Sequence, residues 1–173
     1  ADCRRLEVMS LGADHLKMID PGPALFQQAY GVEDFVLCVG RLETRKNQLM
    51  LLKALEHDPI TIVFLTGGFS CQPGYVELCR RFHREGKTLF LDRLPDEMLA
   101  SAYSAARVLC MPSWYELPGL VALEALRFGC PVIASRWGTL PDYVPQGVTY
   151  CEPDDPEGIR TAILSSYAER AKL

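Results

Sequence analysis

The chain has 173 residues, a net charge of −4 and 49% hydrophobic residues, which is the composition of an ordinary globular protein of one domain. Its acidic balance argues against nucleic acid or an anionic membrane as the main partner. The longest mainly apolar strand-like run, residues 60–65, is too short for a transmembrane segment, and the chain does not start with the basic-then-apolar pattern of a signal peptide.

The first 33 residues form the least regular part of the sequence, and we expect them to be a linker that leads into a domain over residues 34–173. Residues 20–23, Asp-Pro-Gly-Pro, break any helix, and a short helix is expected over residues 27–30. His15 is interpreted as a loop residue rather than a catalytic base. The expected domain boundary therefore falls at residue 34.

From residue 34 onward, short apolar runs alternate with helical patterns. Strands are predicted over residues 35–39, 60–65, 88–91, 107–111, 131–134 and 148–151. Helices are predicted over residues 46–57, 75–84, 95–104, 118–128, 139–143 and 155–168. This alternation is typical of a parallel sheet covered on both faces, so the predicted fold is α/β, a Rossmann-like doubly wound sheet of about six strands. Ligands of such folds bind outside the carboxyl ends of the strands.

Seven cysteines are present, an odd number, and no two are spaced as in a CxxC motif. Those at positions 38, 110 and 151 fall in or beside apolar strand-like runs. They are interpreted as reduced, mostly buried residues of a cytoplasmic protein. The spacing of zinc ligands is absent, so no metal site is predicted.

The stretch from residue 112 to residue 131 lies between two predicted strands and carries two glutamates, Glu116 and Glu124. Pro118 suits the first position of a helix, because its missing N–H would have no partner there. The free N–H groups of that helix start favour phosphate, and Gly119 would let a ligand approach the backbone. The stretch therefore predicts an anion site with a carboxylate on each side, which is the layout of a nucleotide-sugar.

The predicted helix is apolar nearly all round, so it should be buried, and its Glu124 then requires a partner. A simpler interpretation of the stretch stays open. In that interpretation Glu116 caps the helix and Glu124 pairs with an arginine, and neither binds a ligand.

Two cations, Arg41 and Lys46, follow the first predicted strand, just after Gly40. Arginine at a strand end presents a fork of donors to phosphate oxygens. Lysine in a first helical turn is poorly placed for the helix dipole, which indicates an anion nearby. The alternative is a solvated basic loop. The sequence has neither the GxGxxG fingerprint after this strand nor the Gly-Lys-Ser/Thr phosphate loop, which weakens a nicotinamide or flavin interpretation.

At this point the sequence resembles the C-terminal, donor-binding half of retaining glycosyltransferases of GT-B fold, family 4, also called glycosyl transferases group 1. The resemblance covers about residues 8–168. The matching pieces, in the family's order, are Val39-Gly40-Arg41-Leu42, Lys46, Pro112-Ser113, Glu116, Glu124-Ala125, Gly129, Pro131-Val132-Ile133-Ala134 and Pro153-Asp154-Asp155.

The resemblance implies a role for each matching residue. Arg41 and Lys46 would hold the donor diphosphate and, with Glu116, form the catalytic set. Glu116 would bind the donor sugar and Glu124 the ribose. The remaining donor-binding positions that it implies are Gly40, Pro118, Gly119, Leu120 and Val121.

The resemblance also implies a reaction. The enzyme would transfer a hexose from a GDP- or UDP-sugar to a glycan or a lipid-linked acceptor with retention, without metal or cofactor. The leaving phosphate would assist removal of the acceptor proton. The acceptor would bind an N-terminal domain for which this chain has no room, so the chain alone should bind donor and transfer little. The expected location is the cytoplasm, or the inner membrane surface through the missing half.

At two places the sequence departs from the family's common residues, and both concern substrate specificity. Leu117-Pro118-Gly119 stands where the family commonly has Gly-Phe-Gly, and Asp92 stands where glycine is frequent near the presumed base pocket. The form Glu-Leu-Pro-Gly-Leu looks most like transferases of bacterial surface polysaccharides, often of mannosyl type.

Three other functions remain open at this point. A sugar-nucleotide epimerase shares the sheet and the diphosphate site, but the cation and glutamate pairs argue against it. A glycosidase needs carboxylates on both sides of the scissile bond, which one loop and helix fit poorly. The third is a non-catalytic nucleotide-sugar module that docks on a separate subunit.

Glu152-Pro153-Asp154 could suggest a metal-binding acidic motif, but Pro156 makes the start of a helix the more natural interpretation.

Overall fold

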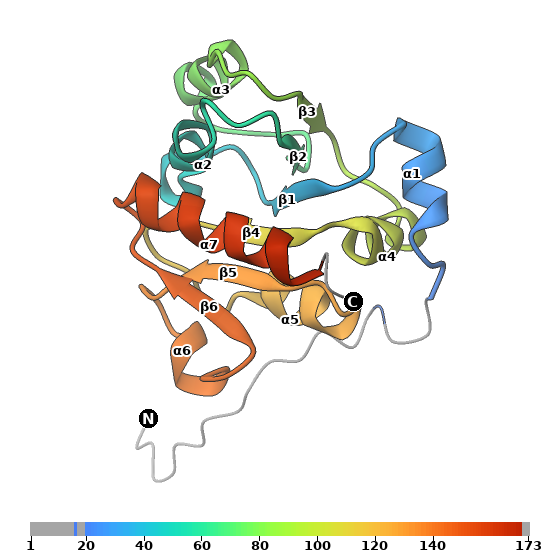
Figure 1. The fold of residues 1–173 in the computed structure, drawn as a ribbon. Coiled ribbons are helices and arrows are strands. Elements are labelled where there is room, and N and C mark those ends of the chain that lie inside the picture. The colour runs from blue at the N-terminus through green and yellow to red at the C-terminus, as the bar shows by residue number, and fades with distance from the viewer. Residues whose placement is uncertain (1–15, 17–19, 171–173) are drawn as a thin grey trace, which may run out of the picture.

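The computed structural model describes residue 16 and residues 20–170, and it contains one sheet of six parallel strands in the order β3-β2-β1-β4-β5-β6 (Figure 1). The strands are β1 Phe35–Val39, β2 Thr61–Leu65, β3 Thr88–Leu91, β4 Val108–Met111, β5 Val132–Ser135 and β6 Val148–Cys151. The strand order reverses between β1 and β4, as in other doubly wound sheets. The predicted α/β fold with six strands is confirmed.

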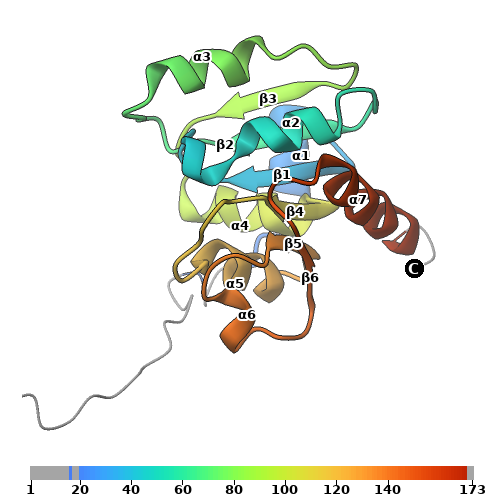
Figure 2. The ribbon, with the colours of Figure 1, turned by 90° about the vertical axis from the view of Figure 1, so that its left-hand side faces the viewer.

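The connecting segments form helices that cover both faces of the sheet (Figures 1 and 2). They are α1 Ala24–Tyr30, the 3₁₀ turn η2 Thr44–Lys46, α2 Gln48–Ala54, α3 Pro73–Arg81, α4 Asp96–Ala105, α5 Leu120–Arg127, α6 Leu140–Tyr143 and α7 Pro156–Arg170.

Two hydrophobic cores form because successive residues of each strand point to opposite faces. Leu37 and Leu109 pack with α1, α4 and α5 on one face. Val36 and Cys110 pack with α2, α3 and α7 on the other. All four strand residues are fully buried. The sheet is therefore packed on both faces, and the loops that follow its strands lie along one edge.

The short helix expected before residue 34 is longer than predicted, and it packs on the domain. Phe26 of α1 is fully buried, its ring lies 5.3 Å from that of Phe35, and its backbone N–H donates to the Ser101 hydroxyl of α4 at 2.9 Å. The boundary at residue 34 stays a prediction, although α1 shares the core of the sheet. His15 lies outside the described residues.

The described cysteines agree with the expectation of buried thiols. Cys38, Cys79, Cys110, Cys130 and Cys151 are buried, and only Cys71 among the described cysteines is exposed. Burial raises the pKa of the Cys38 thiol to about 12, so this thiol is not a nucleophile near neutral pH. The described part of the chain contains no helix with the length and hydropathy of a membrane span, and in it no three or more His, Cys, Asp or Glu side chains gather as a metal site would require.

Candidate functional site

The residues singled out from the sequence gather at the carboxyl ends of β1 and β4, where the strand order reverses. The β1–α2 loop carries Arg41 and Lys46, and the β4–α5 loop carries Glu116. Because β1 and β4 are neighbours in the sheet, two loops that are far apart in sequence meet over the rim. This is the place where doubly wound α/β folds bind their ligands.

The centre of the site is an ion pair between Lys46 and Glu116. The Lys46 Nζ atom lies 2.7 Å from Glu116 Oε2 and 2.9 Å from Oε1, and the two side chains are only 15% and 11% exposed. Ser113 donates its hydroxyl to the same carboxylate at 3.1 Å, and Arg45 Nη1 lies 3.7 Å from it. The carboxylate predicted to cap a helix or to bind a sugar is therefore fixed by a cation.

The prediction that Lys46 starts an α-helix is wrong. Lys46 ends the 3₁₀ turn η2, and α2 begins two residues later at Gln48. Asn47 interrupts the helix because it adopts the left-handed conformation with φ of 57°, so the chain turns before α2 starts. This turn directs Lys46 toward Glu116. The anion that the sequence predicted near Lys46 is therefore present in the chain itself, as the Glu116 carboxylate.

Asn47 also ties the site to its neighbours. Its buried side-chain amide donates to the carbonyl of Pro112 at 2.9 Å and to that of Pro153 at 2.7 Å. These carbonyls follow β4 and β6, so one amide joins three loops of the rim. The adjacent Gln48, also buried, donates to the carbonyl of Arg41 at 2.8 Å. The loop that leads from β1 to α2 is therefore held in one shape before any ligand binds.

The helix behind Glu116 starts later than predicted. Pro118 is not at its first position; α5 begins at Leu120 with Gly119 as its N-cap, in the left-handed conformation with φ of 75°. That conformation cannot belong to the helix, so the free N–H groups start after Gly119. A side chain at position 119 would meet Leu140 of α6 at 3.3 Å. The missing side chain thus accommodates Leu140, in addition to any ligand at the backbone.

Glu124 lies on the buried side of α5, as its apolar surroundings predicted, and it is only 7% exposed. One partner is Tyr103 of α4, whose Oη donates to Glu124 Oε2 at 2.6 Å. Burial and the neighbouring Glu124 charge raise the pKa of the Tyr103 hydroxyl, so the tyrosine stays protonated and remains a donor. Glu124 is thereby held in place on α5 behind the site.

Arg41 lines a cavity of about 430 Å³, together with Gly40 at the end of β1. Its side chain is 55% exposed, and its Nε atom lies 2.8 Å from Glu43 Oε1. The cavity opens at the ends of β1, β2 and β3 and reaches the first turn of α4. Its lining combines the charged residues Arg41, Asp92, Arg93 and Asp96 with Gly40, Gly67 and several apolar side chains. Asp92, the position that departs from the resemblance, therefore faces this cavity.

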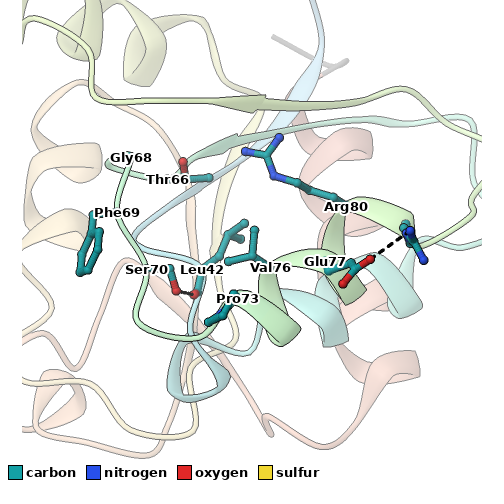
Figure 3. A pocket seen from close by; sticks show the side chains of 10 residues that line it. Leu42, Thr66, Gly68, Phe69, Ser70, Pro73, Val76, Glu77 and Arg80 are labelled. Atoms are coloured by element: carbon teal, nitrogen blue, oxygen red, sulfur yellow. Dashed lines mark hydrogen bonds and ion pairs between the residues drawn. The ribbon is translucent and has the colours of Figure 1, made fainter.

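A larger cavity of about 520 Å³ lies between the β2–α3 loop and α3 (Figure 3). Leu42, Pro73 and Val76 form its apolar floor, and the Ser70 hydroxyl closes one side by donating to the Leu42 carbonyl at 2.6 Å. None of the residues predicted for the donor lines it. We therefore assign the smaller cavity to the site, because it contains Gly40 and Arg41.

Sequence reasoning missed the loop after β5, which completes the site. The Glu116 N–H donates to the Trp137 carbonyl at 3.3 Å, and the Thr139 N–H donates to the Glu116 carbonyl at 3.2 Å. Gly138, between them, has a φ of 129°, and a Cβ there would clash with the Glu116 backbone. A glycine soon after a predicted strand was the available signal, since it often marks close approach of another backbone.

Tyr143 of α6 was also missed. Its hydroxyl oxygen is buried and has no hydrogen-bond partner within the part of the chain that the structure describes. Burial and the charge of Glu116 raise the pKa of this hydroxyl, which therefore stays protonated at neutral pH.

The site therefore combines two cations, a fixed carboxylate and the N-terminus of an eight-residue helix over the switch point of a parallel sheet. This arrangement suits a ligand with phosphates and hydroxyls, and the chain is a Rossmann-like α/β domain. The chain belongs to the family described as glycosyl transferases group 1, whose model matches residues 26–172. The resemblance drawn from the sequence is thus confirmed.

Individual relatives agree with this assignment. The O-antigen chain mannosyltransferase B of Escherichia coli is 33% identical over 153 residues, which are 85% of this chain and 40% of that protein. The D-inositol 3-phosphate glycosyltransferase of Kribbella flavida is 36% identical over 162 residues, 84% of this chain and 38% of that protein. The chain thus spans about 40% of the length of these relatives.

Among solved structures, sucrose-phosphate synthase from Thermosynechococcus elongatus matches with a TM-score of 0.72 and 30% identity. The match covers 90% of this chain and 42% of that one. The described domain is accordingly a glycosyltransferase domain of the GT-B type.

Proposed function

We propose that the chain is the donor-binding half of a retaining, metal-independent hexosyltransferase. The donor is a nucleotide-sugar, such as a GDP- or UDP-hexose, and the acceptor is a glycan or a lipid-linked glycan. The observation that carries the proposal is the Lys46–Glu116 ion pair, which stands over the sheet's switch point beside the start of α5. It offers one cation to a phosphate and one carboxylate to sugar hydroxyls.

The charges of the site fit the charges of the reaction. When the bond between the sugar carbon and the diphosphate breaks, positive charge develops on the sugar and negative charge on the leaving diphosphate. Lys46, Arg41 and the N–H groups of Leu120 and Val121 would stabilise the diphosphate where that charge appears. The acceptor oxygen bonds to the same face of the sugar, and its proton passes to a diphosphate oxygen. No side chain of this domain has to act as a base.

The two glutamates would hold the ends of the donor. Glu116, already fixed by Lys46 and Ser113, would accept hydrogen bonds from the transferred sugar. Glu124 would bind the ribose while Tyr103 holds its carboxylate in position. The base would enter the cavity beside Gly40 and Asp92.

The mannosyl interpretation rests on weaker support. One similar relative is named a mannosyltransferase and another a D-inositol 3-phosphate glycosyltransferase, so the transferred sugar is a hexose in our proposal and mannose its first candidate. A nucleotide-sugar donor also favours a cytoplasmic location. Family membership favours transfer over the epimerase and glycosidase alternatives. A non-catalytic module that binds the same donor remains the second candidate function.

Titration calorimetry with GDP, UDP and ADP tests the donor site. We expect one of the three to bind with micromolar to millimolar affinity and with the same affinity in EDTA as in magnesium. A folded chain that binds none of the three contradicts the donor-site proposal. Binding that disappears in EDTA contradicts its metal independence.

Replacing Arg41 by alanine should weaken binding of the preferred nucleoside diphosphate by more than about tenfold, since one charge-assisted phosphate contact is lost. The fold should be unaffected, because the side chain is more than half exposed. Arg81→Ala, which removes an exposed arginine of α3 that also pairs with a nearby glutamate but lies outside this cavity, is the matched control. Equal affinities of Arg41→Ala and the unmodified chain would refute the assignment of Arg41.

A further inference from the structure

An exposed aromatic cluster stands beside the donor site and has no role in the function proposed above. Trp114 and Tyr115 precede Glu116 in the β4–α5 loop, and Trp137 follows β5. Their exposed fractions are 38%, 49% and 49%, and the two indole rings meet edge to face at a centroid distance of 6.2 Å. We call Trp114, Tyr115 and Trp137 the aromatic platform. Exposed apolar groups that gather in this way mark interaction sites.

The aromatic platform is attached to the backbone that carries the donor site. The Trp114 N–H donates to the Arg45 carbonyl at 2.9 Å, and Arg45 Nη1 donates to the Tyr115 carbonyl at 2.9 Å. The Trp137 carbonyl accepts the N–H of Glu116. Because Arg45 precedes Lys46 and Trp137 pairs with Glu116, the backbone that carries the rings is bonded to the backbone that carries the Lys46–Glu116 pair. A molecule on the platform is therefore next to a sugar held by Glu116.

Polar groups are fixed at the edge of the platform. Trp137 Nε1 donates to Glu152 Oε2 at 2.9 Å, and Arg136 Nε lies 2.7 Å from Glu152 Oε1. All three side chains are partly exposed to solvent, so a carboxylate and a guanidinium lie beside an indole ring. This combination suits a pyranose, which has a face of C–H groups for an aromatic ring and hydroxyls at its edge for charged partners.

We propose that the aromatic platform binds a sugar unit of the acceptor glycan, next to the donor sugar. This inference rests on the proposed function and extends it, because it assigns part of the acceptor site to this domain. A lipid surface fits the platform less well, since the charges at its edge are a balanced arginine–glutamate pair and membrane-surface sites are rich in lysine and arginine. A free glycan and the glycan part of a lipid-linked acceptor present the same chemistry.

The chain suits a direct test, because its two tryptophans are both members of the platform. Their fluorescence therefore reports on the platform alone. We expect a saturable change in emission when mannohexaose or maltohexaose is added to the full chain, and none with vesicles of phosphatidylcholine and phosphatidylglycerol. Calorimetry with the preferred nucleoside diphosphate is run on the same sample.

Variants of the two tryptophans test whether their indole rings bind the oligosaccharide. Trp137→Ala should weaken oligosaccharide binding, measured by calorimetry, by about fivefold or more, and Trp137→Phe should retain most of it. Leu78→Ala, which removes an exposed apolar side chain of α3, should change nothing. If Trp137→Ala does not fold, Trp114→Ala and Trp114→Phe serve as the same pair.

The outcomes separate the two proposals. Nucleotide binding without any oligosaccharide binding, equal binding by Trp137→Ala and the unmodified chain, or an emission change with vesicles alone would each overturn the platform as a glycan site. Oligosaccharide binding by a folded chain that binds no nucleotide would instead overturn the donor site and leave the platform standing. Sugar binding that needs the tryptophan rings, on a chain that binds nucleotide, supports both.

Discussion

Replacing Lys46 by alanine is expected to weaken nucleoside diphosphate binding by about a hundredfold. The mutation removes the cation placed deepest in the site. It also leaves the Glu116 carboxylate, which is 11% exposed, beside the phosphates without its counter-charge. Both changes act against an anionic ligand. Titration calorimetry with the preferred nucleotide measures the loss.

The same variant should be less stable by about 2–3 kcal/mol, because removing one partner of a largely buried ion pair leaves the other charge desolvated. Urea unfolding measures this loss in the free energy of unfolding. Lys53→Ala is the matched control, since Lys53 is an exposed residue of α2 and should change neither quantity. The double variant Lys46→Ala with Glu116→Ala should recover stability but not affinity. Full nucleotide affinity in Lys46→Ala would contradict the assignment of the ion pair.

Replacing Asn47 by alanine is expected to destabilise the domain by about 3 kcal/mol. Two hydrogen bonds, to the Pro112 and Pro153 carbonyls, are lost at about 1 kcal/mol each. A further cost of about 1 kcal/mol arises because alanine tolerates the left-handed conformation poorly. Nucleotide affinity should fall as well, since the loop that directs Lys46 loses its anchor. Urea unfolding and calorimetry measure the two effects.

Asn47→Gly separates the two causes. Glycine accepts the left-handed conformation, so this variant should lose only the hydrogen bonds and be destabilised by about 2 kcal/mol. Gln72→Ala is the control, because it removes an exposed side-chain amide that accepts one hydrogen bond from the Thr44 N–H. Equal stability of Asn47→Ala and the unmodified chain would show that the amide does not hold the three loops together.

The fold could be predicted from the sequence because each strand coincides with a short apolar run. Phe35–Val39 and Val108–Met111, for example, lie where the pattern placed strands, since both faces of these central parallel strands are buried. The first residues of the helices were predicted less accurately than the strands. Asn47 and Gly119 both adopt left-handed conformations, and a sequence pattern does not show which residue of a loop will take that conformation.

The candidate site was predictable in part. Arg41, Lys46 and Glu116 stood out as charges after strands, and the structure brings Lys46 and Glu116 into contact. The partners that fix them were not visible, because they come from distant segments. Tyr103, which holds Glu124, has the sequence surroundings of an ordinary core tyrosine, and Trp137 contributes its backbone carbonyl to Glu116. Backbone contacts of this kind leave little trace in residue identity.

The most direct test of the account is a crystal structure of the chain with the nucleoside diphosphate that calorimetry selects. We expect the diphosphate between Arg41 and Lys46 at the start of α5, with the base in the cavity that contains Gly40 and Asp92. A nucleotide bound instead in the larger cavity between the β2–α3 loop and α3, away from Lys46 and Glu116, would contradict the account.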